Sequence, residues 1–81
     1  MLPAAEIEKV VVEEWCAILE TPDHHLDDEF FALGGNSLMA VEFVANVERR
    51  LGFAFPFEAL FVEGTLGSVI EACRGADAEA S

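Results

Sequence analysis

Apolar residues recur at helical spacing in three separate segments of this chain, and this recurrence constrains its fold more than any other feature. In each segment the apolar side chains would lie on one side of a helix, and that side needs another element to cover it. The inward-facing residues would be Ile7, Val10, Val11, Trp15, Ile18 and Leu19 in the first segment, Ala40, Phe43, Val44, Val47 and Leu51 in the second, and Leu66, Val69, Ile70 and Cys73 in the third. The sequence therefore predicts a small all-α protein.

Residues that favour helix ends delimit the first two helices. Pro3 suits the first turn of the first helix, because its fixed φ is helical and its missing N–H is not needed there. Thr21 and Pro22 close that helix. The second helix is expected over residues 37–51, with Gly52 directly after its end.

The remainder of the chain predicts a short and a long helix. A short third helix is expected at residues 58–62. Thr65 can cap a fourth helix, which Gly75 would end. We therefore expect one four-helix domain over residues 1–75 and a flexible C-terminal tail over residues 76–81.

The connection between the first two helices, residues 23–36, is unusually long. A stretch of this length without structure is uncommon in a compact domain unless it is functional. Phe30, Phe31 and Leu33 are expected to anchor it to the core, through a short helical turn after residues 27–28. This loop is therefore the first place to look for a functional site.

The loop ends in Gly34, Gly35 and Asn36 and leads into Ser37 at the start of the second helix. Glycines without Cβ atoms let a partner or a phosphate approach the main chain closely. Unpaired N–H groups and the positive end of the helix dipole favour an anion at this position. The Ser37 hydroxyl can therefore be a helix cap or the attachment point of a negatively charged group.

A second set of apolar residues on the same helix, Leu38, Val41 and Ala45, lies near the face of Ser37, because residues four apart stack on one side. A wide helix contact could bury this set as well as the core stripe. Alternatively, the set stays exposed beside Ser37 and forms a docking surface for partner proteins. Met39 fits either interpretation.

Length and charge restrict the function. The chain has 81 residues, too few for a core that also encloses a complete catalytic pocket. Acidic residues outnumber basic ones sixteen to four, giving a net charge of −12. This charge argues against nucleic acid or an anionic membrane as a partner and favours proteins with basic patches. It also keeps a small protein soluble.

The cysteines and the N-terminal sequence indicate the compartment. Cys16 and Cys73 are too few for the disulfide framework of a small secreted protein, and they lack the spacing of metal ligands. Glu6 and Glu8 stand where a signal peptide would carry positive charge, and no apolar stretch reaches membrane-spanning length. We expect reduced thiols and a soluble cytoplasmic protein.

Motifs for metal binding and for catalysis are missing. His24 and His25 are adjacent but have no further ligands at a suitable spacing. The acidic run at residues 23–29 lacks the pattern of a calcium loop. A hydrolase motif G-x-S-x-G around Ser37 fails, because Met39 occupies the place of the second glycine. We therefore expect no catalytic residue and no metal site, so that the protein is not an enzyme.

The chain resembles the phosphopantetheine-dependent carrier proteins, and the peptidyl carrier (thiolation) type in particular. The resemblance rests on VEEWCAIL at 12–19, DEFFALGGNSL at 28–38, ALF at 59–61 and the Thr65–Leu66 pair, and it covers nearly the whole chain. The second stretch is specific, whereas acyl carriers of fatty-acid and many polyketide systems usually have Asp-Ser-Leu without paired glycines. The resemblance implies a four-helix bundle with a short third helix and a long loop between the first two.

The resemblance also implies a covalent cofactor. A phosphopantetheinyl transferase with Mg²⁺ would move 4′-phosphopantetheine from coenzyme A onto Ser37, beside Gly34, Gly35 and Asn36, and make the chain a phosphoprotein. An adenylating enzyme would then load an amino or aryl acid as a thioester on the thiol of the arm. Condensing, tailoring or thioesterase enzymes of nonribosomal peptide-type biosynthesis would receive it.

Partner enzymes of the resembled family contact the helix after the serine and the short third helix. In this chain those contacts would fall on Leu38, Met39, Val41, Ala45 and Phe61. The resemblance implies a monomer.

Two other functions stay open. One is an acyl carrier of a polyketide or fatty-acid pathway, which the acid carried on the thiol would distinguish. The other is an unmodified protein-interaction domain. A free-standing carrier, as the short ends starting at Met1 suggest, and a domain of a larger synthetase both stay open.

Overall fold

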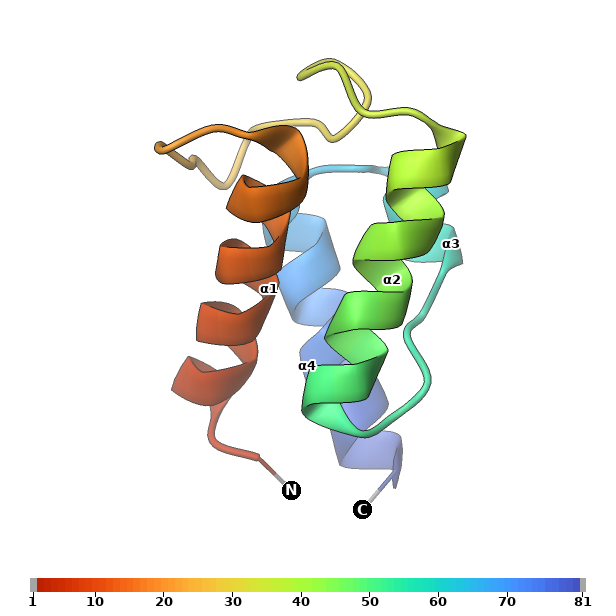
Figure 1. The fold of residues 1–81 in the computed structure, drawn as a ribbon. Coiled ribbons are helices and arrows are strands. Elements are labelled where there is room, and N and C mark those ends of the chain that lie inside the picture. Colours follow the sequence, from red (N-terminus) through yellow and green to blue (C-terminus); the bar gives the residue numbers. More distant parts are fainter. Residues whose placement is uncertain (1, 81) are drawn as a thin grey trace.

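Four α-helices and their connections form residues 2–80, the part of the chain that the computed structural model describes (Figure 1). They are α1 (Ala4–Leu19), α2 (Ser37–Leu51), α3 (Glu58–Val62) and α4 (Leu66–Ala80). α1 runs antiparallel to α2 and α4 and packs against both, and the short α3 packs against α4. In these residues no strand forms beyond an isolated bridge between Glu29 and Thr65. The predicted all-α fold with a short third helix is confirmed.

The three apolar stripes meet in one core. All their residues are buried except Ile18 and Leu19, which are half-buried and pack against it. Trp15 lies with its ring centroid 5.5 Å from that of Phe30 and 5.9 Å from that of Phe43, both edge to face. Because Phe30 belongs to the loop between α1 and α2, this aromatic group fixes the loop to the helices.

Local sequence accounts for some of the residues that flank the helices. Glu20 directly follows α1 in a left-handed conformation with φ 53°, one residue before the Thr21 and Pro22 that are expected to close this helix. Gly52 directly follows α2 as predicted, with a φ of 82° that glycine adopts without a steric penalty. The Thr65 Oγ1 accepts a hydrogen bond from the Ser68 N–H at 3.2 Å, and Thr65 thus caps α4 as predicted.

The end of α4 differs from the prediction. The helix passes through Gly75 and continues to Ala80, so the expectation that Gly75 ends it is wrong. A glycine inside a helix costs about 1 kcal/mol relative to alanine, and packing beyond it can offset that cost. Here Asp77 is buried and its Oδ2 accepts a hydrogen bond from the Leu2 N–H at 3.0 Å. The flexibility of residues 76–81 stays a prediction, and Ser81 lies outside the described residues.

Backbone hydrogen bonds tie the long loop to the connection between α3 and α4. The Phe30 N–H donates to the Gly64 carbonyl at 2.9 Å. The Leu66 N–H donates to the Asp28 carbonyl, also at 2.9 Å. These two hydrogen bonds hold residues 28–30 of the loop against residues 64–66.

Only one of the three residues expected to anchor this loop does so by burial. Phe30 is fully buried, whereas Phe31 and Leu33 are exposed, and the expectation is wrong for these two. The chain turns over residues 30–34, and the Gly35 N–H closes the turn by donating to the Phe30 carbonyl at 3.0 Å. Successive side chains in such a turn point in different directions, so one anchor buries while its neighbours face outward.

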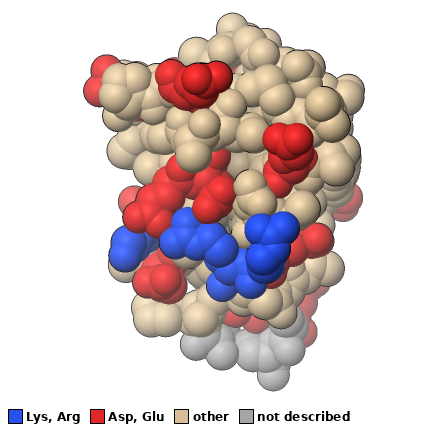
Figure 2. All heavy atoms as spheres, in the orientation of Figure 1, with Lys and Arg blue, Asp and Glu red and all other residues tan. Residues whose placement is uncertain are grey.

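Basic side chains gather in one part of the surface. Those visible in Figure 2 form a band across the lower half of the view. Arg50 of α2 bridges Glu13 and Glu14 of α1 at 2.8 and 2.9 Å, and Arg74 of α4 pairs with Glu8 of α1 at 3.2 Å. The chain has no Lys or Arg in residues 10–48. The loop and the first turns of α2 thus form an end without positive side chains.

Candidate functional site

Ser37 is the first residue of α2, and its side chain is exposed. Its neighbour Asn36 caps the helix: the Asn36 Oδ1 accepts a hydrogen bond from the Met39 N–H at 2.9 Å. Among the described residues, nothing hydrogen-bonds the Ser37 hydroxyl. Of the two roles open to Ser37, the structure therefore gives the cap to Asn36.

The two glycines before the site act in different ways. Gly34 has a φ of 98°, a conformation that side chains with a Cβ rarely adopt, although nothing lies within 4 Å of where its Cβ would be. Gly35 has an ordinary φ, but a Cβ there would collide with the ring of Phe30 and lie 2.7 Å from its carbonyl oxygen. Gly34 thus permits the turn, and Gly35 permits close packing over Phe30.

The start of α2 suits a negatively charged group. The first turn contains no acidic side chain. Within the described residues, the N–H groups of Ser37 and Leu38 have no acceptor, as is usual for the first turn of a helix. An anion on the Ser37 oxygen would meet these donors and the positive end of the helix dipole. A phosphate ester is compatible with this position.

The residues predicted to bind partners are mostly exposed. Leu38 is 68% exposed, Val41 55% and Phe61 49%, and Ala45 is exposed too. Met39 differs, because it is half-buried and packs against the core. The second apolar set of α2 is therefore not part of the core.

Sequence reasoning did not select two further exposed aromatic residues, Phe31 and Phe57. The ring of Phe61 lies 5.5 Å from that of Phe31 and 5.0 Å from that of Phe57, measured between centroids. The available signal was the Phe30–Phe31 pair, since adjacent side chains of a turn point in different directions. The three rings thus form an exposed aromatic row that joins the loop before α2 to α3.

The cysteines do not supply a reactive thiol. Both are free, with Cys16 half-buried and Cys73 buried. Burial raises the pKa of Cys73 to about 12. Burial, followed by the negative charges of Asp23 and Asp28, raises the pKa of Cys16 as well. Both side chains therefore remain thiols at neutral pH.

Two further properties concern the described residues as a whole. His24 and His25 are exposed, and no group of three or more His, Cys, Asp or Glu is placed to hold a metal ion. No helix there is long and apolar enough to cross a membrane.

Comparison with known proteins gives a consistent result. The model of a family described as "Phosphopantetheine attachment site" matches residues 9–73. The chain is 38% identical over 73 residues to malpibaldin synthetase from Mortierella alpina, covering 90% of this chain and 1% of the synthetase. It is 31% identical over 67 residues to surfactin synthase subunit 3 from Bacillus subtilis, covering 83% of this chain and 5% of that subunit.

A solved structure is similar as well. The solution structure of PCP, described as a prototype for the peptidyl carrier domains of modular peptide synthetases, superposes with a TM-score of 0.67 at 29% identity. The match covers 82% of this chain and 87% of that structure. The chain thus spans nearly the whole carrier structure but only a few per cent of the synthetases.

Proposed function

Because the chain belongs to the phosphopantetheine attachment site family, we propose that the Ser37 Oγ is the atom that carries its 4′-phosphopantetheine arm. The chain is a carrier domain of the peptidyl type, which holds intermediates linked to this arm and is not itself an enzyme. When attached, the arm supplies a terminal thiol that carries an acid as a thioester. The protein supplies the attachment point and the surfaces that partners recognise.

This assignment rests on which hydroxyl groups of the chain are already engaged in hydrogen bonds. Thr21, Thr65 and Ser68 all use their hydroxyl groups in hydrogen bonds to the main chain. Ser37 is the only hydroxyl residue between Thr21 and Thr65, and its side chain is exposed and free of such a bond within the described residues. An incoming group can therefore reach the Ser37 Oγ without breaking local structure.

Attachment transfers the phosphopantetheine group from coenzyme A to Ser37. The Ser37 Oγ forms a bond to the phosphorus of the phosphopantetheine part of coenzyme A. The pyrophosphate bond of coenzyme A breaks, and adenosine 3′,5′-bisphosphate leaves. The hydroxyl proton goes to a base of the transferase, since no described side chain of this chain hydrogen-bonds the Ser37 hydroxyl. This chain presents the hydroxyl at the helix start and leaves the chemistry to the enzyme.

Intact mass spectrometry tests the attachment. After incubation with coenzyme A, Mg²⁺ and a broad-specificity phosphopantetheinyl transferase, the protein should gain the mass of one phosphopantetheinyl group. The Ser37→Ala variant should gain none while keeping its helical circular dichroism. Full modification of that variant would show that the arm is attached at another residue. If the unaltered protein gained no mass, the alternative of an unmodified protein-interaction domain would be favoured.

We further propose that an adenylating enzyme loads the arm with an amino or aryl acid, and that condensing, tailoring or thioesterase domains receive it. Carrier domains of peptide synthetases work with other synthetase domains. The exposed Leu38, Val41, Ala45 and Phe61, with Met39 at their edge, are the proposed contacts. We also propose that the domain is monomeric and acts in the cytoplasm.

Thermal melts combined with transfer kinetics test this surface. Phe43 is buried in α2, and Phe43→Ala should cost about 3–5 kcal/mol of stability. Leu38→Ala and Val41→Ala should keep the melting temperature and weaken partner binding by about 1 kcal/mol or more where the residue is a hot spot. If all three variants melt early, the residues around Ser37 are structural rather than contact residues.

A further inference from the structure

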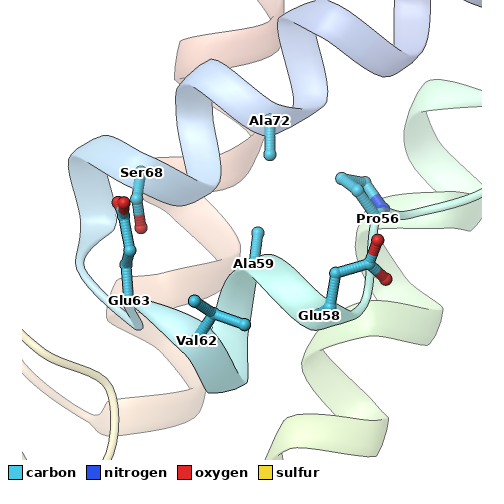
Figure 3. Close-up of a pocket in the computed structure, with 7 residues that line it drawn as sticks. All are labelled: Pro56, Glu58, Ala59, Val62, Glu63, Ser68 and Ala72. Atoms are coloured by element: carbon cyan, nitrogen blue, oxygen red, sulfur yellow. The ribbon is translucent and has the colours of Figure 1, made fainter.

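A second surface lies on the other side of α3, in the groove between α3 and α4. Its volume is about 360 Å³, and seven residues line it, five on α3 and its flanks and two on α4: Pro56, Glu58, Ala59, Val62, Glu63, Ser68 and Ala72. Ala59 and Ala72 face one another across its floor (Figure 3). The groove exists because small side chains meet where the five-residue α3 crosses α4.

The groove is apolar in its centre and exposed to solvent. Val62 is 78% exposed, which makes it the most exposed large hydrophobic side chain of the described residues. The Ser68 hydroxyl already donates to the Thr65 carbonyl at 2.8 Å, so its proton is not available to an occupant. Apolar contact is therefore the main interaction that the centre of this groove can offer.

Two carboxylates mark the ends of the groove. Glu58 starts α3 and its side chain points toward Pro56, whereas Glu63 follows α3 and its side chain extends beside Ser68 (Figure 3). Both are exposed, and neither forms an ion pair with a described residue. The nearest cation along α4, Arg74, is already paired with Glu8 and Glu71. Within the described residues, both ends thus carry negative charge without a partner.

This arrangement selects the chemistry of an occupant. An anion would meet two carboxylates, and a purely apolar residue would leave both unpaired. A Lys or Arg side chain fits, because its methylene groups can cover the apolar centre while its charged end reaches a carboxylate.

We propose that the groove between α3 and α4 is a docking site for a segment of a partner protein that places an Arg or Lys beside an apolar residue. None of the residues that line the groove belongs to α2 or to the loop before it, so a partner can dock here without contacting Ser37 through these residues. Binding here needs no modification of Ser37, and the proposal therefore does not depend on the attachment proposed above.

The test uses the full chain with the Ser37→Ala substitution, so that no arm can be present. The probe is a short capped peptide of alternating leucine and arginine, titrated into ¹⁵N-labelled protein at low salt. The largest changes in amide chemical shift should fall on residues 56–63 and on Ser68 and Ala72. Largest changes at the start of α2, or equal changes over the whole acidic surface, would overturn the proposal.

Matched variants separate the groove from the general negative charge. Glu58→Gln with Glu63→Gln should weaken peptide binding by about fivefold or more relative to Glu6→Gln with Glu79→Gln, which removes the same charge from exposed residues outside the groove. Equal weakening in both pairs would contradict the proposal.

A third variant tests the apolar centre. Val62→Asn removes apolar surface without changing charge, and it should weaken binding while the near-ultraviolet circular dichroism of Trp15 stays the same. Unchanged affinity in Val62→Asn would show that the groove does not hold the apolar residue of the peptide. The charge-reversed peptide of leucine and glutamate should not bind, and its binding would overturn the proposed specificity for cations.

Discussion

Asn36 and Ser37 are adjacent residues with separate tasks. Asn36 satisfies an N–H of the first turn of α2 through its side chain, and Ser37 keeps its hydroxyl exposed. If Ser37 were the cap, attachment of a group would compete with helix stability. The division of tasks at residue scale therefore lets the serine be modified without loss of the helix start.

Substitution of these two residues should give opposite results. Asn36→Ala removes the cap and should lower the free energy of unfolding by about 0.5–2 kcal/mol. Ser37→Ala removes an exposed hydroxyl that makes no bond within the described residues, and the change should stay within about 0.5 kcal/mol. Urea unfolding of both variants measures this, and an equal loss in the two would contradict the assignment of the cap to Asn36.

Added side-chain volume should destabilise the protein at Gly35, although Gly35 lacks the positive φ of its neighbour Gly34. Gly35→Ala places a methyl group against Phe30 and should cost about 1–3 kcal/mol. Because Phe30 contacts Trp15, the near-ultraviolet circular dichroism of Trp15 should change too. Gly34→Ala should cost about 1–2 kcal/mol through its backbone alone, with an unchanged Trp15 signal. A changed Trp15 signal in Gly34→Ala and an unchanged one in Gly35→Ala would contradict the contact between Gly35 and Phe30.

At the scale of elements, α3 and α4 depend on packing more than on local sequence. α3 has only five residues, too few for a stable isolated helix, and its Leu60 is fully buried. α4 continues beyond Gly75 because the turn that follows it buries Asp77. Tertiary contacts thus determine how long each of these helices is.

The interior position of Gly75 predicts a stabilising substitution. Nothing lies within 4 Å of a Cβ at this position, and its φ is not positive. Gly75→Ala should therefore raise the free energy of unfolding by about 0.5–1 kcal/mol. Gly67→Ala is the control, because its Cβ would lie 3.3 Å from the Leu26 carbonyl oxygen and should bring no such gain. A destabilised Gly75→Ala would mean that α4 ends there in solution.

At the scale of the whole molecule, burial and charge are distributed unevenly. The exposed ion pairs of Arg50 and Arg74 connect α1 to α2 and to α4. Such exposed pairs contribute little each, about 0–1 kcal/mol, so the shared apolar core holds the domain together. That core also contains the thiol of Cys73, which only unfolding of the domain brings into water.

The buried thiol predicts a loss of stability at alkaline pH. Burial raises the pKa of Cys73 from its ordinary 9.0 to about 12. Between these values the unfolded chain loses the thiol proton while the folded protein keeps it, so the unfolded state binds fewer protons. The contribution of this group to stability is therefore complete below pH 9 and falls as the pH rises toward 12.

Chemical unfolding at a series of alkaline pH values measures this effect. Cys73→Ala lacks the titrating thiol, and its stability should fall less steeply over the same range. Cys16 is present in both proteins, so its own titration cancels in the comparison. Parallel curves for the two proteins would contradict the raised pKa of Cys73.

The sequence by itself determined the four helices, the core stripes of α1, α2 and α4 and the place of Ser37. Helical spacing of apolar residues and the chemistry of Pro, Gly and Thr at helix ends are local signals, and a single chain contains them in full. The exposure of Leu38 and Val41 stayed open, because a stripe on a helix does not show which neighbour covers it.

Tertiary structure alone decided the remaining features. Phe31 and Leu33 stay exposed although they are apolar, and the ring of Phe31 contacts those of Phe30 and Phe61 without entering the core. α4 passes Gly75 because packing of the next turn outweighs a weak local preference. The groove beside Val62 depends on how α3 crosses α4. The last two features arise from contacts between residues far apart in the chain, which local sequence patterns do not show.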